Sequence, residues 1–462
     1  MKLTVLGAGS RTPLLLRGLA QRAGTLPVRE VVLHDADPAR LALMAWLGSR
    51  LCESWGAGIT VRPADDARDA IAGARFVLAA IRVGGDDGRV LDERLALEHG
   101  VIGQETTGPG GFAMALRTIP PMLEHAWLVE ELAPGALLIN FTNPAGLVTQ
   151  AIRDHSAVPA VGICDTPVAA KRSLARFLGL PDDEVRLDYL GLNHLGWIRG
   201  VHAEGSDHLP ELLHRYEELA ASDLMWRLFD PELVRGLGML PNEYLHYYYA
   251  RRDVLARLQG APVTRGEQVR ELNRSLWAHL GRAAAADDLD DALSAHEETI
   301  RTREATYLSG ELGVEPPTPI AADGPGFEGA GYEGLATAVM VAALGNHRAP
   351  LILNVPAAGA VEGADPHDVL ELPCVFEDGV PVPVAQPALP PAAAALAGPV
   401  KAFERLTIEA AVSGSRRAAV TALASHPLVG DHATAASLVT AYLRAHERHL
   451  AAFRRAPAEV GR

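Results

Sequence analysis

Lysine is scarce in this chain of 462 residues, where it supplies only three of the 42 basic residues, Lys2, Lys171 and Lys401. Any phosphate-binding role therefore falls to arginine, whose planar guanidinium group grips an oxyanion through two hydrogen bonds. Positive charge is also in the minority, because 57 acidic residues leave a formal net charge of −15 at pH 7. Such a charge repels polyanions, so we expect neither nucleic acid nor a membrane surface as a partner.

Cysteines and long apolar runs are equally sparse. Cys52, Cys164 and Cys374 are odd in number and widely spaced, which argues against a disulfide framework and favours a reducing, cytoplasmic location. No apolar window of about 18 residues is present, and the run at residues 3–6 is too short for a signal peptide. The length and the ordinary composition, with 48% hydrophobic residues, indicate a globular protein of two or three domains.

Short β-rich runs alternate with helical segments in the first third of the chain, a pattern typical of a parallel sheet covered by helices. Strands are expected at Lys2–Leu6, Val31–Asp35, Phe76–Ile81, Leu137–Phe141 and Ala160–Cys164. Helices are expected at Pro13–Ala20, Pro38–Trp55, Phe112–Glu131 and Ala145–His155. The sequence thus predicts an α/β fold, with a Rossmann-like, doubly wound parallel sheet in residues 1–170.

The pattern changes after that point, and residues 171–462 are predicted to form an α+β domain, with the boundary near residues 170–190. Val185–Val201 and Leu351–Val355 resemble strands, and Pro381–Pro399 is interpreted as a loop or linker. Helices are expected at Leu209–Ala220, Pro231–Leu237, Glu243–Leu258, Glu267–Arg282 and Tyr332–Leu344. A mostly helical tail at residues 403–454 could pack back onto the first domain.

A glycine-rich turn follows the first predicted strand and opens a helix, as a phosphate-binding turn requires. Gly7 and Gly9 would let the backbone approach a pyrophosphate, and Ser10 lies at the start of the helix. Thr12 replaces the third glycine of the usual fingerprint. Asp35, at the end of the next strand, is the expected acceptor for ribose hydroxyls and favours NAD over a 2′-phosphorylated cofactor.

One cysteine and one histidine stand where they could hold a metal ion. Cys164 ends a predicted strand at the same sheet edge as the glycine turn, and His194 lies 30 residues later on an apolar strand. A thiolate and an imidazole suit a borderline divalent metal. A buried inert thiol and a core histidine are the alternatives that the spacing alone leaves open.

Seven motifs in order carry a resemblance to a known family. They are Gly103–Phe112 (GQETTGPGGF), Ala115–Pro120 (ALRTIP), Phe141–Gly146 (FTNPAG), Cys164–Pro167 (CDTP), Gly191–Trp197 (GLNHLGW), Pro241–Tyr249 (PNEYLHYYY) and Ile352–Pro356 (ILNVP). From residue 3 to about residue 380 the chain resembles the NAD- and manganese-dependent family 4 glycoside hydrolases, most closely their 6-phospho-β-glucosidases. This family is an exception to hydrolysis by two carboxylates.

The resemblance implies hydrolysis of 6-phospho-β-glucosides by an unusual route. NAD⁺ would take hydride from C3 of the sugar, which makes the C2 proton acidic. Mn²⁺ or another divalent metal, held by Cys164 and His194, would stabilise the charge that develops on loss of that proton. The C1 substituent is then eliminated, water adds, and the hydride returns. A cytoplasmic homodimer or homotetramer is also implied.

The resemblance assigns roles to further residues of the second domain and the sheet edge. Tyr244 is the implied base, with Tyr247 and Tyr248 as alternatives. An ordinary phenol has a pKa near 10, so it would need a cationic neighbour to ionise at neutral pH. Arg89, Arg265 and Asn143 are implied to bind the phosphate of the sugar, and Glu105 is implied to bind its hydroxyls. Asn354 could form the floor of the site.

One position departs from the β-specific pattern. Those enzymes usually carry asparagine after the metal-binding cysteine, whereas this chain has Asp165, as 6-phospho-α-glucosidases do. In those relatives the aspartate is assigned as the general acid, so hydrolysis of 6-phospho-α-glucosides is an alternative. The fold signals would also suit an NAD-dependent hydroxyacid dehydrogenase or a non-catalytic sugar-phosphate sensor.

Overall fold

The computed structural model describes residues 1–308, 313, 331–345 and 350–455. Its strands join in one mixed sheet of 13 strands, whose main path runs β10-β8-β7-β12-β11-β6-β5-β4-β1-β2-β3. Strands β13 and β9 pair with β12 and β8, outside that path. The predicted division at residue 170 stays a prediction, since this sheet runs through both parts of the chain.

Six parallel strands form the first half of the sheet in the order β3-β2-β1-β4-β5-β6, the order of dinucleotide-binding folds. They are β1 (Lys2–Leu6), β2 (Glu30–His34), β3 (Thr60–Pro63), β4 (Phe76–Ala79), β5 (Leu137–Asn140) and β6 (Ala160–Gly162). Strands β4, β5 and β6 are buried along their whole length, as expected for a sheet with helices on both faces. The predicted Rossmann-like α/β class is confirmed.

Helices connect these strands and cover the sheet. They are α1 (Thr12–Gln21), α2 (Pro38–Ser54), α3 (Ala67–Ile71), α4 (Gly85–Glu98), α5 (Gly108–Leu132), α6 (Ala145–His155) and α7 (Thr166–Leu178). Local sequence explains where α2 begins, because Asp37 accepts hydrogen bonds from the amides of Ala39 and Arg40, and Pro38 fits the first helical position.

The second half of the sheet is antiparallel. Its strands are β7 (Arg186–Leu192), β8 (Leu195–Ala203), β9 (Ser206–Asp207), β10 (Leu240–Pro241), β11 (Leu351–Pro356), β12 (Val369–Glu377) and β13 (Val380–Pro383). Strand β11 joins the two halves by pairing with β6 on one side and with β12 on the other. Strands β7 and β8 form a hairpin in the region expected to be a single strand-like run.

One row of paired residues crosses nearly the whole sheet. It starts with the last residues of five parallel strands and continues through the antiparallel half: His34, Leu6, Ala79, Asn140, Gly162, Asn354, Glu371, Gly191 and Gly196. Ligands of doubly wound sheets bind beyond the carboxyl ends of the strands. The row therefore marks where polar side chains gather.

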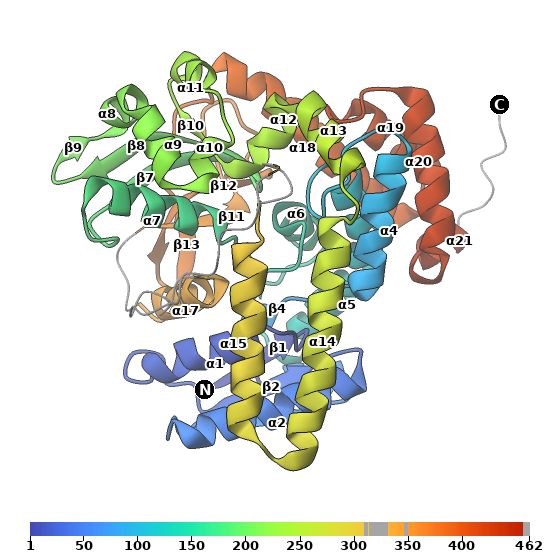
Figure 1. The fold of residues 1–462 in the computed structure, drawn as a ribbon. Coiled ribbons are helices and arrows are strands. Elements are labelled where there is room, and N and C mark those ends of the chain that lie inside the picture. The colour runs from blue at the N-terminus through green and yellow to red at the C-terminus, as the bar shows by residue number, and fades with distance from the viewer. Residues whose placement is uncertain (309–312, 314–330, 346–349, 456–462) are drawn as a thin grey trace.

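The remaining helices fall into two groups along the chain (Figure 1). The first group contains α8 (Leu209–His214), α9 (Tyr216–Ser222), α10 (Leu224–Arg227), α11 (Pro231–Leu237), the 3₁₀ turn η1 (Glu243–Leu245), α12 (His246–Tyr249), α13 (Arg251–Gly260), α14 (Arg265–Ala286) and α15 (Leu289–Ala305). Helices α14 and α15 are long antiparallel neighbours that also pack on α2.

The second group of helices lies in the last third of the chain. Its members are α17 (Tyr332–Ala343), α18 (Pro391–Ser413), α19 (Arg416–Ser425), α20 (His432–Ala445), the 3₁₀ turn η3 (Glu447–His449) and α21 (Ala451–Arg455). Helices α18 and α19 pack on α5, and α20 packs on α4. The expected return of the C-terminal helices to the first part of the chain is therefore confirmed.

Several sequence expectations need correction. Pro381–Pro399 is no linker, because its first residues belong to β13 and its last to α18, where prolines stand at the helix start. The predicted helix Glu243–Leu258 is divided into η1, α12 and α13. The elements not anticipated include β3, α3, α4, α7, β9, α10, β10, α15 and β12.

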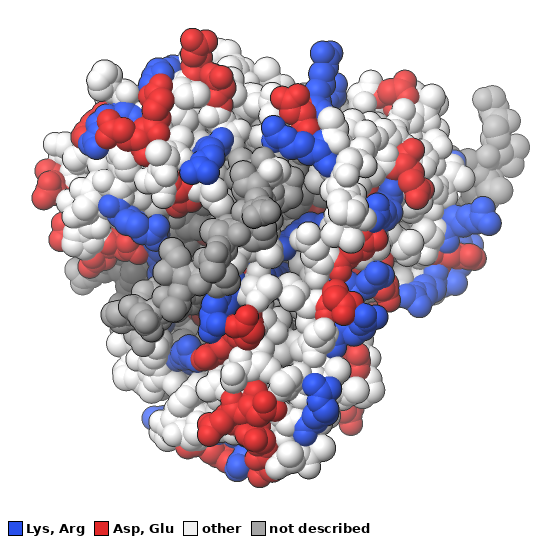
Figure 2. Space-filling view, viewed as in Figure 1, with Lys and Arg blue, Asp and Glu red and all other residues white. Residues whose placement is uncertain are grey.

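Charged side chains are mixed over the visible face of the molecule, where blue and red groups alternate rather than separate (Figure 2). In the ranges that the structure describes, no helix is both long enough and apolar enough to span a membrane.

Candidate active site

The backbone of the glycine turn after β1 borders an open space. Gly7 has a φ of +94°, and a Cβ there would lie 2.5 Å from the carbonyl oxygen of Ala80. A Cβ on Gly9 would meet nothing within 4 Å, so the backbone at Gly9 faces a free volume. The Ser10 carbonyl accepts a hydrogen bond from the His296 ring at 2.6 Å, which fixes the turn against α15. This cradle fits a diphosphate.

Asp35 stands directly after β2, beside this turn, since the amide of Gly7 donates to the carbonyl of His34 at 2.8 Å. Its Oδ1 accepts from the amide of Asp37 at 2.8 Å and from Arg40 Nη2 at 3.1 Å. Within the described ranges no donor reaches Oδ2, so this oxygen is free to accept a ribose hydroxyl. The structure thus groups Gly7, Gly9, Ser10 and Asp35 at one corner of the sheet.

Cys164 and His194 meet although 30 residues separate them. Cys164 follows β6, and His194 occupies the two-residue turn between β7 and β8, with Leu192 pairing Leu195. His194 has a φ of 61°, a left-handed conformation that is uncommon for a residue with a side chain. The distance from Cys164 Sγ to His194 Nε2 is 3.3 Å.

Burial sets the protonation of this pair. It lowers the pKa of His194 to about 4, so the imidazole is neutral at pH 7 and can act as a ligand. Burial, with Glu371 and Asp165 nearby, raises the pKa of the Cys164 thiol well above its usual value. A bound cation would reverse that preference, because coordination deprotonates a thiol.

Tyr244 lies in η1, directly over the pair. Its ring stacks on that of His194, with the centroids 4.0 Å apart and the planes at 22°. Burial raises the pKa of the Tyr244 phenol well above its usual value. The two alternatives lie close by: the ring of Tyr247 is 6.1 Å from that of Tyr244, and Tyr248 lines a small cavity together with His194, with its hydroxyl 3.4 Å from His426 Nε2.

Asp165 connects the two parts of the site. Its Oδ2 is 3.8 Å from Nη1 of Arg11, which precedes α1 at the glycine turn. The next residue, Thr166, donates a hydrogen bond from its hydroxyl to Glu243 Oε1 at 3.1 Å. Burial raises the pKa of Glu243 to about 7, and its Oε2 has no hydrogen-bond partner in the structure.

The arginines predicted to bind phosphate are less accessible than expected. Arg89 is 5% exposed and pairs with Glu93 at 2.8 Å and with Glu105 at 2.7 Å. Although burial opposes ionisation of Glu105, ion pairs with Arg82 and Arg89 hold its pKa well below the usual range. Glu105 therefore remains ionised, and Arg89 is largely occupied by carboxylates.

Arg265 lies near this group, and Asn143 stands just before α6. Arg265 begins α14 and donates to the Thr306 hydroxyl at 2.6 Å and to the Arg303 carbonyl at 2.7 Å. The amide of Gly266 donates to Glu93 at 2.7 Å, which places Arg265 close to the Arg89 ion pairs. Asn143 precedes α6, with its side chain half-buried.

Sequence reasoning missed Arg303, which lies near the end of α15. Burial and the charges of Arg11, Arg82 and Arg89 lower the pKa of its guanidinium to about 9, although Glu105 acts in the opposite direction. Arg303 forms no side-chain ion pair within the described ranges. Apolar residues at Leu289, Ala292, Leu293 and Ile300 follow a helical period and could have revealed α15.

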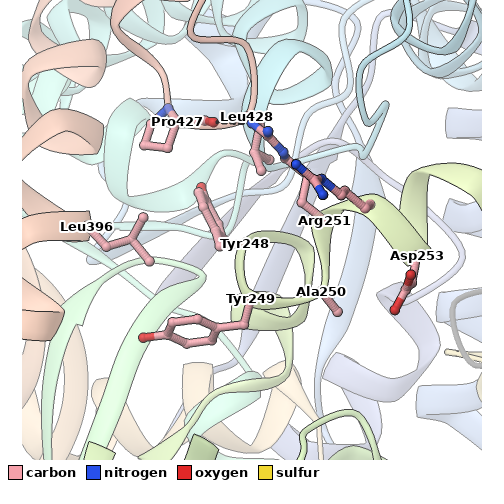
Figure 3. A pocket seen from close by; sticks show the side chains of 9 residues that line it. Tyr248, Tyr249, Ala250, Arg251, Asp253, Leu396, Pro427 and Leu428 are labelled. Carbon is pink, nitrogen blue, oxygen red and sulfur yellow. Dashed lines mark hydrogen bonds between the residues drawn. The ribbon is translucent and has the colours of Figure 1, made fainter.

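Two cavities lie on either side of Tyr248. The larger, of about 480 Å³, is lined by Tyr248, Tyr249, Arg251, Leu396 and Leu428, and Figure 3 shows Tyr248 between Leu396 and Leu428. The smaller, of about 20 Å³, is lined by His194. Of these two cavities only the smaller is lined by His194, and neither is lined by Cys164 or Tyr244.

The donor set at Cys164 and His194 fits a divalent cation. One sulfur and one neutral imidazole nitrogen face each other, and the other ring nitrogen of His194 is buried and has no hydrogen-bond partner among the described residues. Across the described residues, no group of three or more His, Cys, Asp or Glu could hold a metal ion. Such a two-ligand site leaves coordination positions open to substrate oxygens.

The fold and this site define a Rossmann-like α/β protein with a thiol and an imidazole beside its nucleotide turn. Comparison with known families identifies the class more closely. The model described as "Family 4 glycosyl hydrolase" matches residues 2–180, and that described as "Family 4 glycosyl hydrolase C-terminal domain" matches residues 189–429. The chain belongs to the family 4 glycosyl hydrolases and is a glycoside hydrolase, which disfavours the dehydrogenase and sensor alternatives.

Similar proteins include enzymes for both anomers. A 6-phospho-β-glucosidase of Escherichia coli strain K12 is 32% identical over 100% of this chain and 98% of its own length. A 6-phospho-α-glucosidase of Lacticaseibacillus paracasei is 29% identical over 80% of each chain. The solved 6-phospho-β-glucosidase of Thermotoga maritima, with manganese, NAD⁺ and glucose-6-phosphate, has a TM-score of 0.80 at 27% identity, covering 97% of this chain and 99% of that one.

Proposed function

We propose that this enzyme hydrolyses 6-phospho-β-glucosides with the help of NAD⁺ and a divalent cation such as Mn²⁺. The observation that carries the proposal is the meeting of Cys164, His194 and Tyr244, with the Sγ–Nε2 distance of 3.3 Å and the ring stacking at 4.0 Å. The Arg11–Asp165 contact ties this group to the glycine turn. Family membership and the relatives that act on phosphorylated glucosides support the substrate class.

Each cofactor has residues that suit it. Gly7, Gly9 and Ser10 would cradle the diphosphate of NAD⁺ by their backbone, and Asp35 would accept from the ribose. Cys164 and His194 would hold the cation. When bound, NAD⁺ supplies reversible oxidation at the sugar C3, and the cation supplies Lewis-acid polarisation of the neighbouring sugar oxygens.

Two protein groups would then move protons. Tyr244 is the base that takes the proton from C2, and its position over His194 favours it over Tyr247 and Tyr248. Asp165 would protonate the leaving oxygen, and its 3.8 Å approach to Arg11 orients it towards the nucleotide corner. General acid–base steps of this kind contribute about 10²–10⁴-fold to a rate.

Arginines would bind the 6-phosphate. Arg303 is the strongest candidate, because its guanidinium forms no side-chain ion pair within the described ranges and lies near the like charges of Arg11, Arg82 and Arg89, so a phosphate would stabilise it. Arg89, Arg265 and Asn143 would complete the phosphate site. Glu105 would hold Arg82 and Arg89 in place and accept from sugar hydroxyls.

The α-linked substrate is the second candidate, favoured by Asp165 after the cysteine and by the 6-phospho-α-glucosidase relative. Matched chromogenic α- and β-linked 6-phospho-glucosides, assayed side by side with Mn²⁺, NAD⁺ and a reductant, distinguish the two. We expect faster turnover of the β-anomer and no turnover after removal of metal and NAD⁺. Full activity without either cofactor would overturn the proposal.

We further propose that the enzyme works in the cytoplasm as a homodimer or homotetramer. The three free cysteines and the phosphorylated substrate class support the location. Light scattering of the purified protein tests the oligomeric state, and a monomer as the active species would refute it.

A further inference from the structure

We propose that Glu371 is a positioning residue that holds the turn with His194 and the segment with Tyr244 in register. This inference rests on the proposed function, because the two residues that it positions are the proposed metal ligand and base. Glu371 is the third residue of β12 and is 1% exposed.

The carboxylate of Glu371 accepts three hydrogen bonds from three different elements. Asn193 Nδ2 donates to Oε1 at 3.1 Å, and Asn354 Nδ2 donates to the same oxygen at 2.9 Å. The Tyr189 hydroxyl donates to Oε2 at 2.9 Å. Glu371 thereby joins β12 to β11, to β7 and to the β7–β8 turn.

The first branch leads to the metal pair. Asn193 immediately precedes His194 in the two-residue turn, and its Oδ1 accepts from the amide of Gly146 at 3.3 Å. A Cβ on Gly146 would lie only 2.8 Å from the Asn193 Cβ, so α6 closely contacts this side chain. Asn193 is thus fixed from both sides, and the left-handed backbone of His194 follows directly after it.

The second branch leads to Tyr244. The Tyr189 hydroxyl accepts from Asn242 Nδ2 at 3.1 Å while it donates to Glu371. Asn242 Oδ1 in turn accepts from the backbone amide of Tyr244 at 2.9 Å. A Cβ on Gly196 would lie 2.2 Å from the Tyr189 hydroxyl, which leaves that ring no room to move towards β8.

The partners of Glu371, like those of Glu243, differ from those of three other buried carboxylates. Asp92 pairs with Arg117, Glu93 with Arg89, and Glu404 with Lys401. All three donors to Glu371 are neutral, and a buried negative charge without a cation is costly. A divalent cation on the Cys164 thiolate would carry one residual positive charge, which the Glu371 carboxylate would balance. Mutation of a carboxylate that supports the metal ligands through hydrogen bonds typically weakens metal binding about 10- to 100-fold.

Glu371→Gln tests the first branch, with Mn²⁺ alone as the probe. Gln has one oxygen, so it cannot accept from both the asparagines and Tyr189 in the present arrangement, and it lacks the charge. Electron paramagnetic resonance measures the free Mn²⁺ and so gives the Kd of the variant, which should be about 10- to 100-fold higher than that of wild type. The affinity of the variant for NAD⁺ should stay within twofold of wild type. Asp368→Asn is the matched control, because Asp368 lies three residues away and pairs with Arg405.

Tyr189→Phe tests the second branch and keeps the proposal falsifiable if Glu371→Gln does not fold. We expect kcat to fall at least tenfold, with KM and the Mn²⁺ Kd within twofold of wild type. Tyr216→Phe is the control, since Tyr216 is equally buried and its hydroxyl donates to the Trp226 carbonyl at 2.7 Å, away from the carboxylate.

The outcomes separate this proposal from the function itself. Wild-type enzyme that binds no Mn²⁺ would overturn the proposed function and the positioning role together. Tight Mn²⁺ binding by wild type and Glu371→Gln alike, or unchanged kcat in Tyr189→Phe, would overturn the positioning role alone. Equal losses in the control variants would likewise contradict it, because they would indicate general destabilisation.

Discussion

The nucleotide corner and the metal corner of this site are built in different ways. At the first, residues 7–10 supply backbone from one short turn, and only Asp35 adds a side chain from the next strand. At the second, Cys164, His194 and Tyr244 are separated in the chain and converge through β6, the β7–β8 turn and η1. A backbone cradle depends on local conformation, whereas a side-chain cluster depends on the whole sheet being in register.

This difference implies that substitutions at the two corners should have separable effects. Substitutions at the metal corner should abolish Mn²⁺ binding and leave NAD⁺ binding intact, and those at the nucleotide corner should weaken NAD⁺ binding and leave Mn²⁺ binding intact. Arg303 lies between the corners, on a helix whose His296 contacts the glycine turn at 2.6 Å. Its loss should weaken substrate binding alone.

Cys164→Ser should give the largest effect. Serine replaces a soft sulfur donor by a hydroxyl that rarely ionises, so the cation should be lost. Lewis-acid stabilisation contributes several kcal/mol, and activity should fall on the order of 10³-fold. Activity assays and Mn²⁺ titration check this, with NAD⁺ affinity as the readout expected to stay unchanged.

Cys52→Ser is the matched control for that variant. Cys52 is 3% exposed on α2, at the other side of the sheet, so it tests the general cost of burying a hydroxyl. Retained activity in Cys164→Ser would show that the sulfur is an inert core group and would remove the distinction between the two corners.

Arg303→Gln should have an intermediate effect. Charge-assisted hydrogen bonds contribute about 1.5–3 kcal/mol, so KM for the phosphorylated glucoside should rise about 10- to 100-fold with a smaller change in kcat. Steady-state kinetics measure both parameters. Arg301→Gln, on the same helix with an exposed ion pair to Glu298, should leave KM unchanged. Equal KM values for wild type and Arg303→Gln would place the phosphate elsewhere.

Asp35→Ala should have the smallest effect of the three. Asp35 already accepts from Arg40 and from the Asp37 amide, so its bond to ribose is one of several. A net loss of about 1 kcal/mol predicts roughly fivefold weaker NAD⁺ binding, measured by fluorescence titration. Asp37→Ala should lower the melting temperature through the lost helix cap and leave NAD⁺ affinity intact. Weaker Mn²⁺ binding in Asp35→Ala would contradict the separation of the corners.

The sequence was most informative for elements that are determined by residues close together in the chain. The glycine turn and the strands and helices predicted in the first 160 residues lie close to their predicted positions, since each depends on neighbouring residues, although β3, α3 and α4 were missed. Capping explains the agreement at α2, where Asp37 and Pro38 specify the helix start. A mostly helical tail was predicted from residue 403, whereas α18 begins at Pro391.

The other elements and site residues depend on contacts between distant parts of the chain, which no short sequence pattern indicates. Strand β12 carries Pro373 within a strongly buried run, and proline argues against a strand in sequence-based reasoning. Glu371 was therefore not recognised, although it lies where three donors converge. Arg89 was identified by family resemblance, but sequence could not indicate that Glu93 and Glu105 occupy its guanidinium.

The most direct test of the account is solvent exchange at C2 of the sugar. Turnover of a 6-phospho-β-glucoside in deuterated water, with Mn²⁺ and NAD⁺, should place deuterium at C2 of the recovered glucose-6-phosphate, as mass spectrometry or NMR would detect. Tyr244→Phe, which lacks the base stacked on His194, should lose this exchange together with its activity. Product released at the wild-type rate with only protium at C2 would contradict the account.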